Sequence, residues 1–175
     1  SLALALARLK APGGREPRIL LLEAQGLNFG HHPGFDARAI ALSYGSERIL
    51  TSLGLWAAFS QSFSPITSIH VSDRTHFGRV ELNCSEFRIP RLGGVVELQH
   101  AGAALYELMA QCPAIECVAP SCITQLIQQP DHVVLSTTDR QYQARLLLLA
   151  DGAQSPWREQ LRIPVQEDAF DQSAV

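Results

Sequence analysis

The segment Arg18–Glu23 constrains the fold more than any other feature of this sequence, because it holds a short unbroken run of apolar residues. A strand that is apolar on both faces has to be buried on both, and such strands belong to parallel sheets. An Ala- and Leu-rich stretch, Leu2–Leu9, favours a helix, and the Pro-Gly-Gly breaker at 12–14 ends it. Helix, turn and buried strand form the second half of a βαβ unit, so we expect an α/β protein whose first strand precedes Ser1.

Composition excludes several classes of function. The chain has 175 residues, of which 46% are hydrophobic and 18% charged, which is typical of a globular domain. With 14 Lys and Arg against 17 Asp and Glu, the net charge of -3 gives no general attraction to phosphate polymers. We therefore expect no nucleic-acid partner. The apolar start could also be the core of a signal peptide, but it lacks a basic segment before it and is too short to cross a bilayer, which favours the helix.

The four cysteines form neither a Cys-x-x-Cys pair nor a Cys-His pattern at metal spacing. We expect reduced, small apolar side chains and a cytoplasmic location, with a disulfide or zinc site as the less favoured alternative. The pair His31-His32 lies in a Gly- and Pro-rich loop at 25–35, where a solvated turn is favoured over a metal site because no third ligand is in view. The sequence thus predicts no metal centre.

The remaining pattern predicts alternating helices and strands. A helical pattern covers 37–59 with a break near Gly45 or Gly54, and a second helical stripe covers 99–111. Strands are expected at 66–71 and 79–82 around a turn, followed by a loop through 93–94. Three closely spaced strand candidates then predict a meander, at 117–127, 132–137 and 141–150.

Two groups of polar residues stand where a nucleotide could bind. Glu23 ends the buried strand, and an acid at that position can accept the hydroxyl hydrogens of an adenosine ribose. On residue type alone, a charged residue that simply meets water at the strand end is the favoured interpretation. Asp151, Gly152 and Ser155 follow an apolar run and open a short helix near Pro156. Glycine permits a tight turn, and the Asp and Ser side chains can bind ribose or phosphate oxygens at a helix start. A plain N-cap turn is the alternative for this group.

The pattern Asp151-Gly-x-x-Ser155-x-x-Arg158 resembles the Asp-Gly motif of the class A flavoprotein monooxygenases. The segment Phe35–Leu42 resembles the part of that family whose arginine lies along the flavin. Within the family, the segments at 70–78 and 94–98 are most similar to the hydroxylases of ubiquinone biosynthesis, and the resemblance covers nearly the whole chain. The family's glycine-rich loop should precede Ser1, and its second flavin motif should follow the last residue.

The resemblance implies a role for individual residues in binding FAD. Glu23 would hold the adenosine ribose, Arg38 would reach the phosphate or ribityl side of the flavin, and Asp151 would support the pyrophosphate region. Glu97 would touch the ribityl chain from the start of a helix, and backbone at Ile123 would meet adenine. Gly152 and Ser155 complete the predicted set through the turn that they form. No catalytic side chain is implied, because in this chemistry the cofactor performs the difficult step.

The resemblance also implies the architecture and the reaction. The fold would be an incomplete Rossmann-like FAD-binding domain over 1–175, with a β-meander and with 62–96 beginning a β-rich substrate domain. The full enzyme would reduce FAD with NAD(P)H and, through a flavin hydroperoxide, transfer one oxygen of dioxygen to a polyprenylated phenol. Its insoluble substrate would bring it to the inner-membrane surface or to a ubiquinone-biosynthesis assembly, while the fragment alone would be inactive. The alternative is an FAD- or nucleotide-binding fragment, or a reductase-like relative, without hydroxylase activity.

The segment His70–His76 contains two histidines and an aspartate, which suggests acid–base or triad chemistry. Adjacent residues of a strand point to opposite faces, and the sequence has no Gly-x-Ser-x-Gly turn, so a triad is excluded. A structural turn or a domain contact is the favoured interpretation.

Overall fold

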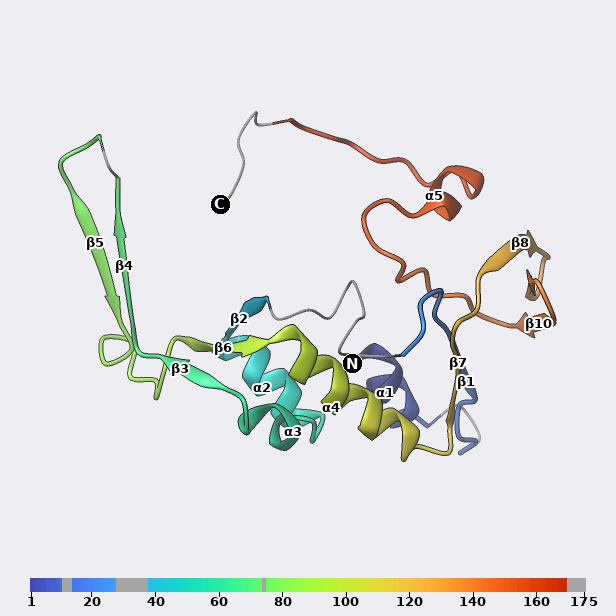
Figure 1. The fold of residues 1–175 in the computed structure, drawn as a ribbon, viewed down its shortest axis with the longest axis horizontal. Helices are drawn as coiled ribbons and strands as arrows, with labels where there is room; N and C mark the ends of the chain where they lie inside the picture. Colours follow the sequence, from blue (N-terminus) through green and yellow to red (C-terminus); the bar gives the residue numbers. More distant parts are fainter. Residues whose placement is uncertain (11–13, 28–37, 74, 170–175) are drawn as a thin grey trace. The chain divides into compact units, whose positions relative to one another are not determined.

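The computed structural model describes residues 1–10, 14–27, 38–73 and 75–169. It divides into two compact units, Ser1–Ser121 and Cys122–Val175, which we describe separately. The helices of the first unit are α1 (Leu2–Ala7), α2 (Tyr44–Ser52), α3 (Trp56–Ser60) and α4 (Leu98–Ala110) (Figure 1). Its strands are β1 (Ile19–Leu22), β2 (Ala39–Ser43), β3 (Ser64–Ile66), β4 (Ser68–Ser72), β5 (Arg79–Asn83), β6 (Gly93–Glu97) and β7 (Ile115–Val118). The second unit contains β8 (Ile123–Gln128), β9 (Val133–Thr137), β10 (Gln141–Ala144) and α5 (Pro156–Gln160).

The apolar run after the N-terminal helix forms β1, which pairs in parallel with β7 over its whole length. Helices α1 and α4 both contact β7, so helices and a parallel strand pair alternate as in α/β proteins. The predicted helix at the N-terminus and the parallel pairing are therefore confirmed. Every residue of β1 is half-buried, not buried on both faces as the apolar run predicts. The mixed α/β class is confirmed, and a Rossmann-like sheet remains a prediction.

The helical pattern predicted over 37–59 is wrong at its start. Ala39–Ser43 forms β2, which runs antiparallel to β6, and helix begins only at Tyr44. The Ser43 hydroxyl caps α2 by accepting a hydrogen bond from the Ser46 amide at 3.2 Å. Gly54, with φ of +60°, follows α2, so the break predicted there is correct. Alternate side chains of β2 are exposed, which is the periodicity of a half-buried strand. The Ala and Leu residues of the segment also favour a helix, and they make this strand pattern hard to recognise in the sequence.

Strand β6 stands where the sequence predicts a loop through 93–94. It is the central strand of a three-stranded sheet in the order β2-β6-β3, and both glycines are buried. A Cβ on Gly93 would collide with the carbonyl oxygen of Leu42, and a Cβ on Gly94 would collide with the Phe63 ring. The two glycines therefore serve close packing within a strand and do not mark a turn.

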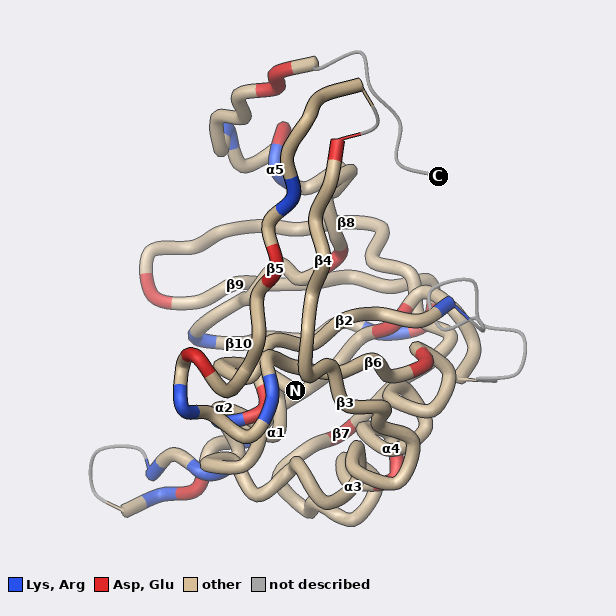
Figure 2. Tube along the Cα trace, turned by 90° about the vertical axis from the view of Figure 1, so that its left-hand side faces the viewer, with Lys and Arg blue, Asp and Glu red and all other residues tan. Residues whose placement is uncertain are grey.

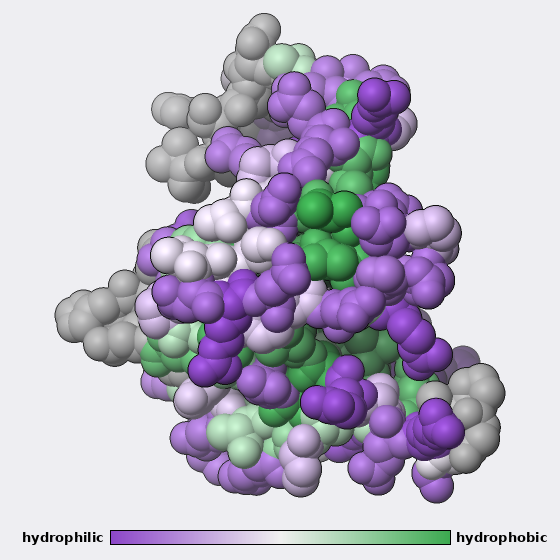
Figure 3. All heavy atoms as spheres, turned by 90° about the vertical axis from the view of Figure 1, so that its right-hand side faces the viewer, coloured by the Kyte–Doolittle hydropathy of each residue, from purple (hydrophilic) through white to green (hydrophobic). Residues whose placement is uncertain are grey.

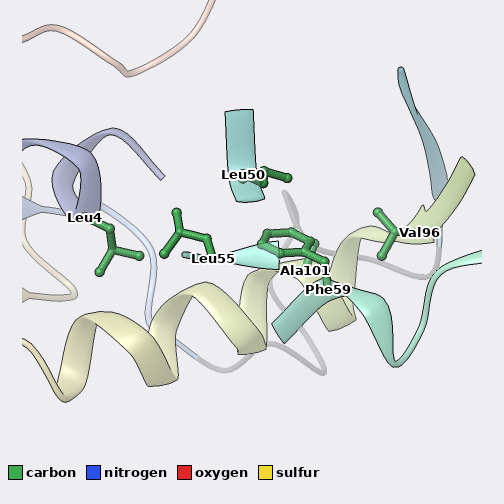
Figure 4. Close-up of a cluster of buried hydrophobic side chains, with 6 residues drawn as sticks. All are labelled: Leu4, Leu50, Leu55, Phe59, Val96 and Ala101. Atoms are coloured by element: carbon green, nitrogen blue, oxygen red, sulfur yellow. The ribbon is translucent and has the colours of Figure 1, made fainter. Parts of the chain in front are cut away.

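The core of the first unit lies where the helices meet β6, the central strand of this sheet (Figure 4). Six side chains from α1, α2, α3, β6, α4 and the residue before α3 form it: Leu4, Leu50, Leu55, Phe59, Val96 and Ala101. The helical stripe predicted for 99–111 is confirmed by α4, whose Ala101, Leu105, Leu108 and Met109 lie in or against this cluster. These apolar contacts hold the start of α4 beside the beginning of β2, where the Leu98 amide donates to the Arg38 carbonyl oxygen.

Strands β4 and β5 form a two-stranded antiparallel hairpin, as the sequence predicts. Its pairs Ile69–Leu82 and Val71–Val80 share one face, while His70–Glu81 lies on the other, because directly opposed residues point the same way. All residues of β4 are exposed. The hairpin is thus an amphipathic ribbon. Whether 62–96 begins a substrate domain remains a prediction.

The second unit is built on the antiparallel meander β8-β9-β10, which confirms the predicted meander. Leu126 and Leu135 face each other across β8 and β9 and are both buried. Two boundaries differ from the prediction. The segment 117–127 is divided between β7 and β8, which belong to different sheets, and β10 ends at Ala144, so the leucine run at 146–149 is not a strand.

Hydrophobic and charged residues are distributed over the described part of the chain as follows. Among the described residues, no helix is long and apolar enough to cross a bilayer. Figure 2 shows Lys and Arg scattered among Asp and Glu along the chain. Large hydrophobic side chains are exposed in both units, including Phe77 and Leu146, and the face drawn in Figure 3 shows hydrophobic surface between hydrophilic patches. All four cysteines are free thiols.

Candidate cofactor site

Glu23 follows β1 directly and lies at the carboxyl end of the parallel pair. Its amide donates to Val118 at 3.1 Å, and its carbonyl oxygen accepts from the Ser121 amide at 2.7 Å. The side-chain Oε1 accepts from the Gln25 amide at 2.9 Å, so the half-buried carboxylate also stabilises the turn after the strand. Burial first, and then the negative charge of Glu23, raise the pKa of the Cys117 thiol. Cys117 is therefore held as a neutral thiol and is not a nucleophile.

Arg38 and Glu97 are far apart in the sequence, and the pairing of β2 with β6 brings them together. Arg38 immediately precedes β2, Ala39 pairs with Glu97, and the Arg38 carbonyl oxygen accepts from the Leu98 amide at 2.9 Å. A cationic and an anionic residue of the predicted set thus flank one end of a strand pair. The preceding residues 35–37 of the flavin-like segment, and His31-His32, lie outside the described residues.

Glu97 is the N-cap residue of α4, but its side chain makes no capping hydrogen bond. Instead, its Oε2 accepts from Gln99 Nε2 at 2.7 Å and lies 3.4 Å from His100 Nδ1. The Glu97 side chain is 46% exposed, so the carboxylate lies at the surface at the start of α4. The partial positive charge of a helix N-terminus favours an anion or an oxygen-rich group at this position.

In the second unit, the Asp-Gly turn has the geometry that its sequence predicts. Gly152 has φ of +91°, which only glycine adopts readily, and no atom lies within 4 Å of the place of a Cβ. Asp151 is exposed beside it. The turn therefore leaves open space next to a carboxylate, which suits the close approach of a ligand to the backbone.

Ser155 and Arg158 each have a buried polar atom without a hydrogen-bond partner in the described part of the chain. Ser155, the N-cap of α5, is only 7% exposed, yet its Oγ has no hydrogen-bond partner in the described part of the chain. The Nε of Arg158 is likewise buried without a partner, while its Nη2 donates to the Ala153 carbonyl oxygen. Buried polar atoms are nearly always hydrogen-bonded, so these two atoms require a polar partner, which a water molecule or a ligand group could supply.

Ile123 is the first residue of β8 and pairs with Thr137, just before a bulge. Its side chain is half-buried. A bulge interrupts the ladder and can leave backbone groups for a ligand, which is compatible with the predicted contact to adenine. The role of Ile123 remains a prediction, as do the roles of the other six residues.

Sequence reasoning missed two polar contacts in these regions. Gln99 was predicted only as part of a helix, and Arg158 only as part of a motif. The contact of Gln99 with Glu97 depends on the extended conformation of the N-cap, with φ of -74° and ψ of 135°, which no local pattern reveals. The orphaned Nε of Arg158 follows from burial, which is also a property of the folded chain.

The histidine-containing turn between β4 and β5 is local in structure. Asp73 Oδ2 lies 2.7 Å from His76 Nδ1, and Asp73 Oδ1 accepts from the Thr75 amide at 3.2 Å. The Thr75 amide bond first and the His76 contact second lower the pKa of Asp73. All three side chains are exposed at the end of the hairpin, which favours the structural-turn interpretation. No cluster that could hold a metal occurs among the described residues.

Comparisons with known proteins bear on both the fold and the family resemblance. No protein-family model matches the sequence. The ubiquinone hydroxylase UbiL of Rhodospirillum rubrum is 28% identical over 148 residues, which cover 81% of this chain and 33% of UbiL. The predicted resemblance to ubiquinone-pathway hydroxylases is confirmed. The chain spans about a third of the length of this curated relative.

Two crystal structures are similar in fold. The p-nitrophenol 4-monooxygenase PnpA of Pseudomonas putida superposes with a TM-score of 0.71 at 17% identity, covering 91% of this chain and 39% of PnpA. The flavin-dependent monooxygenase PieE, solved with FAD and substrate, gives a TM-score of 0.71 at 20% identity, covering 94% of this chain and 30% of PieE. The described residues therefore have the fold of part of a flavin-dependent monooxygenase.

The chemistry of these residues fits FAD as the ligand. Its ribose and ribityl hydroxyls need carboxylate acceptors such as Glu23, Glu97 and Asp151, and its phosphates need donors. The unpartnered Ser155 Oγ and Arg158 Nε supply two buried donors. Taken by itself, each unit contains groups of the required chemistry.

Proposed function

We propose that this chain is part of an FAD-dependent monooxygenase that hydroxylates a polyprenylated phenol in ubiquinone biosynthesis. The observation that carries the proposal is the similarity to a ubiquinone hydroxylase over 81% of the chain. The glycine-dependent turn at Gly152 and the unpartnered Ser155 hydroxyl support it, since both belong to the segment that resembles the family's Asp-Gly motif.

In this proposal the chain binds and orients the cofactor. Glu23 accepts the hydroxyl hydrogens of the adenosine ribose, and Arg38 neutralises charge on the phosphate or ribityl side. Glu97 accepts from ribityl hydroxyls at the start of α4, and the backbone at Ile123 meets adenine. Asp151, Gly152 and Ser155 form the turn that supports the pyrophosphate region, and Arg158 adds a donor beside it. When bound, FAD supplies activation of dioxygen and transfer of one oxygen atom to the ring.

The cosubstrates and the location follow from the same proposal. NAD(P)H would supply the electrons, and dioxygen the transferred oxygen. A substrate with a polyprenyl tail is nearly insoluble, so we propose a cytoplasmic enzyme that contacts the inner-membrane surface or a ubiquinone-biosynthesis assembly. The incomplete Rossmann-like domain and the contribution of 62–96 to a β-rich substrate domain belong to this proposal.

The test uses the full-length protein with Asp151→Ala, and Asp139→Ala as the control because Asp139 is an exposed carboxylate of the same unit. A hydrogen bond to a charged group is worth roughly 1.5–3 kcal/mol, so the affinity for FAD should fall about ten- to a hundredfold in Asp151→Ala. Flavin fluorescence titration measures it. NAD(P)H oxidation that depends on an added prenylated phenol separates a hydroxylase from an FAD-binding protein without this activity. Wild-type protein that retains no flavin would overturn the proposal.

A further inference from the structure

We infer that Gln99 is a positioning residue, which acts by orienting the Glu97 carboxylate toward the bound cofactor. The inference rests on the proposed function, because it assigns a second residue to the part of the site in which Glu97 would meet the ribityl hydroxyls. The contact with Gln99 also explains why the Glu97 carboxylate does not occupy the usual capping position of an N-cap side chain.

The geometry at the start of α4 sets Glu97 apart from an ordinary cap. An N-cap side chain usually accepts from a backbone amide of the first helical turn. Glu97 makes no such bond, and its Oε2 instead accepts from Gln99 Nε2 at 2.7 Å. Side chains two residues apart within a helix do not face each other, so this contact requires the extended backbone of Glu97. The backbone of Glu97 is fixed in turn by the pairing of β6 with β2.

The contact defines the direction of the carboxylate and leaves it able to bind more. Gln99 Nε2 and His100 Nδ1 both approach Oε2, at 2.7 Å and 3.4 Å. A carboxylate has about four lone-pair sites, so ligand hydroxyls can be accepted while these contacts persist. With the Glu97 side chain 46% exposed, an unrestrained carboxylate would sample several rotamers. A fixed one loses less conformational entropy when the ligand binds.

A merely structural role for Gln99 predicts a different result from a positioning role. The core of this unit is formed by other side chains, so removal of the Gln99 amide group creates no cavity among them. The stability of the protein without FAD should then be unaffected, while the affinity for FAD should fall. The effect should also vanish when Glu97 is absent, because Gln99 acts through it.

The experiment is a double-mutant cycle in the full-length protein, with FAD affinity from flavin fluorescence and unfolding midpoint of the apoprotein as readouts. Gln99→Leu should raise the dissociation constant for FAD about five- to tenfold, with an unchanged midpoint, which is less than the loss of a direct bond to the ligand because Gln99 acts through Glu97. Gln111→Leu at the other end of α4 is the matched control and should change neither the dissociation constant for FAD nor the unfolding midpoint. In a Glu97→Ala background, Gln99→Leu should have no further effect.

The outcomes separate this inference from the proposed function. Weaker binding in Glu97→Ala with unchanged binding in Gln99→Leu overturns the positioning role and leaves the function standing. The positioning role is also overturned if Gln99→Leu lowers the FAD affinity equally with and without Glu97. A lower unfolding midpoint of the Gln99→Leu apoprotein overturns it as well. Unchanged FAD binding in both Glu97→Ala and Asp151→Ala overturns the proposed function itself.

Discussion

Two antiparallel strand pairs of the first unit have similar residues and opposite surroundings. The pair β2–β6 is packed against helices, and Val96 of β6, opposite Ile40, is 1% exposed. In the pair β4–β5 two valines face each other, yet Val71 and Val80 are 54% and 57% exposed. Strand propensity is therefore not what distinguishes the two ladders. The difference is that helices cover β2–β6, whereas the face of β4–β5 that carries the valines is exposed. Packing against helices allows the pair β2–β6 to fix the position of neighbouring residues such as Arg38 and Glu97.

The largest expected effect tests how tightly the covered pair is packed. Gly93→Ala would place a Cβ against the Leu42 carbonyl oxygen, and backbone cannot move aside as a side chain can. We expect a loss of about 3 kcal/mol in the free energy of unfolding, at the upper end for overpacking. Gly26→Ala is the control, since nothing lies within 4 Å of its Cβ. Urea unfolding measures both, and equal stabilities would contradict the close packing described for β6.

A matched pair of valine truncations tests the contrast in burial directly. Val96→Ala removes two buried methyl groups and should cost about 2 kcal/mol, from the transfer of apolar surface plus a residual cavity. Val71→Ala on the hairpin should cost no more than about 0.5 kcal/mol, since its side chain is already largely in water. Similar losses for the two variants would mean that the hairpin face is covered in solution.

A smaller effect than that of Val96→Ala is expected at the ion pair between Arg91, which precedes β6, and Glu47 of α2. Arg91 donates through Nε and Nη2 to Glu47, at 2.7 and 2.6 Å, and lies over the Phe63 ring at 5.5 Å. Hydrogen bonds from Arg91 hold the pKa of the Glu47 carboxyl below its ordinary value, although burial opposes this. Glu47→Gln should therefore lower the free energy of unfolding by about 1.5 kcal/mol at neutral pH.

The pH dependence of that variant has a defined sign. A carboxyl with a lowered pKa in the folded state stabilises the protein fully above its unfolded-state pKa, and this contribution disappears as the pH falls through the folded value. The difference in unfolding free energy between wild type and Glu47→Gln should then be constant near neutral pH and shrink below about pH 4. A difference that grows on acidification would contradict the assignment.

Local patterns predict the elements whose partners lie near them in the sequence. The N-terminal helix, the hairpin at 68–83 and the three-stranded meander are of this kind. The segment Ala39–Ser43 was predicted as helix because Ala and Leu favour helices, and its strand state depends on pairing with the distant β6. The run Leu146–Leu149 has the composition of a strand but no partner strand in the described chain. Composition cannot reveal whether a partner exists.

The residues of the candidate site also differ in whether they lie close together in the sequence or are brought together by the fold. Asp151, Gly152 and Ser155 belong to one turn, and a motif within a few residues was enough to propose them. Arg38 and Glu97 were proposed from resemblance, and their proximity depends on a ladder between distant segments. The unpartnered state of the Ser155 hydroxyl is a property of burial alone. Sequence patterns therefore predicted which residue types are present, and the fold determined which of them lie together.

The amphipathic hairpin has a consequence for handling the isolated polypeptide. Strands β4 and β5 pair with each other in a two-stranded sheet, so each presents one edge of backbone donors and acceptors, with Val71 and Val80 on the adjoining face. An uncovered edge next to apolar side chains is a template for strands of other molecules. The apparent molar mass of the 175-residue chain from light scattering should therefore rise with protein concentration, and Val71→Lys should suppress this self-association.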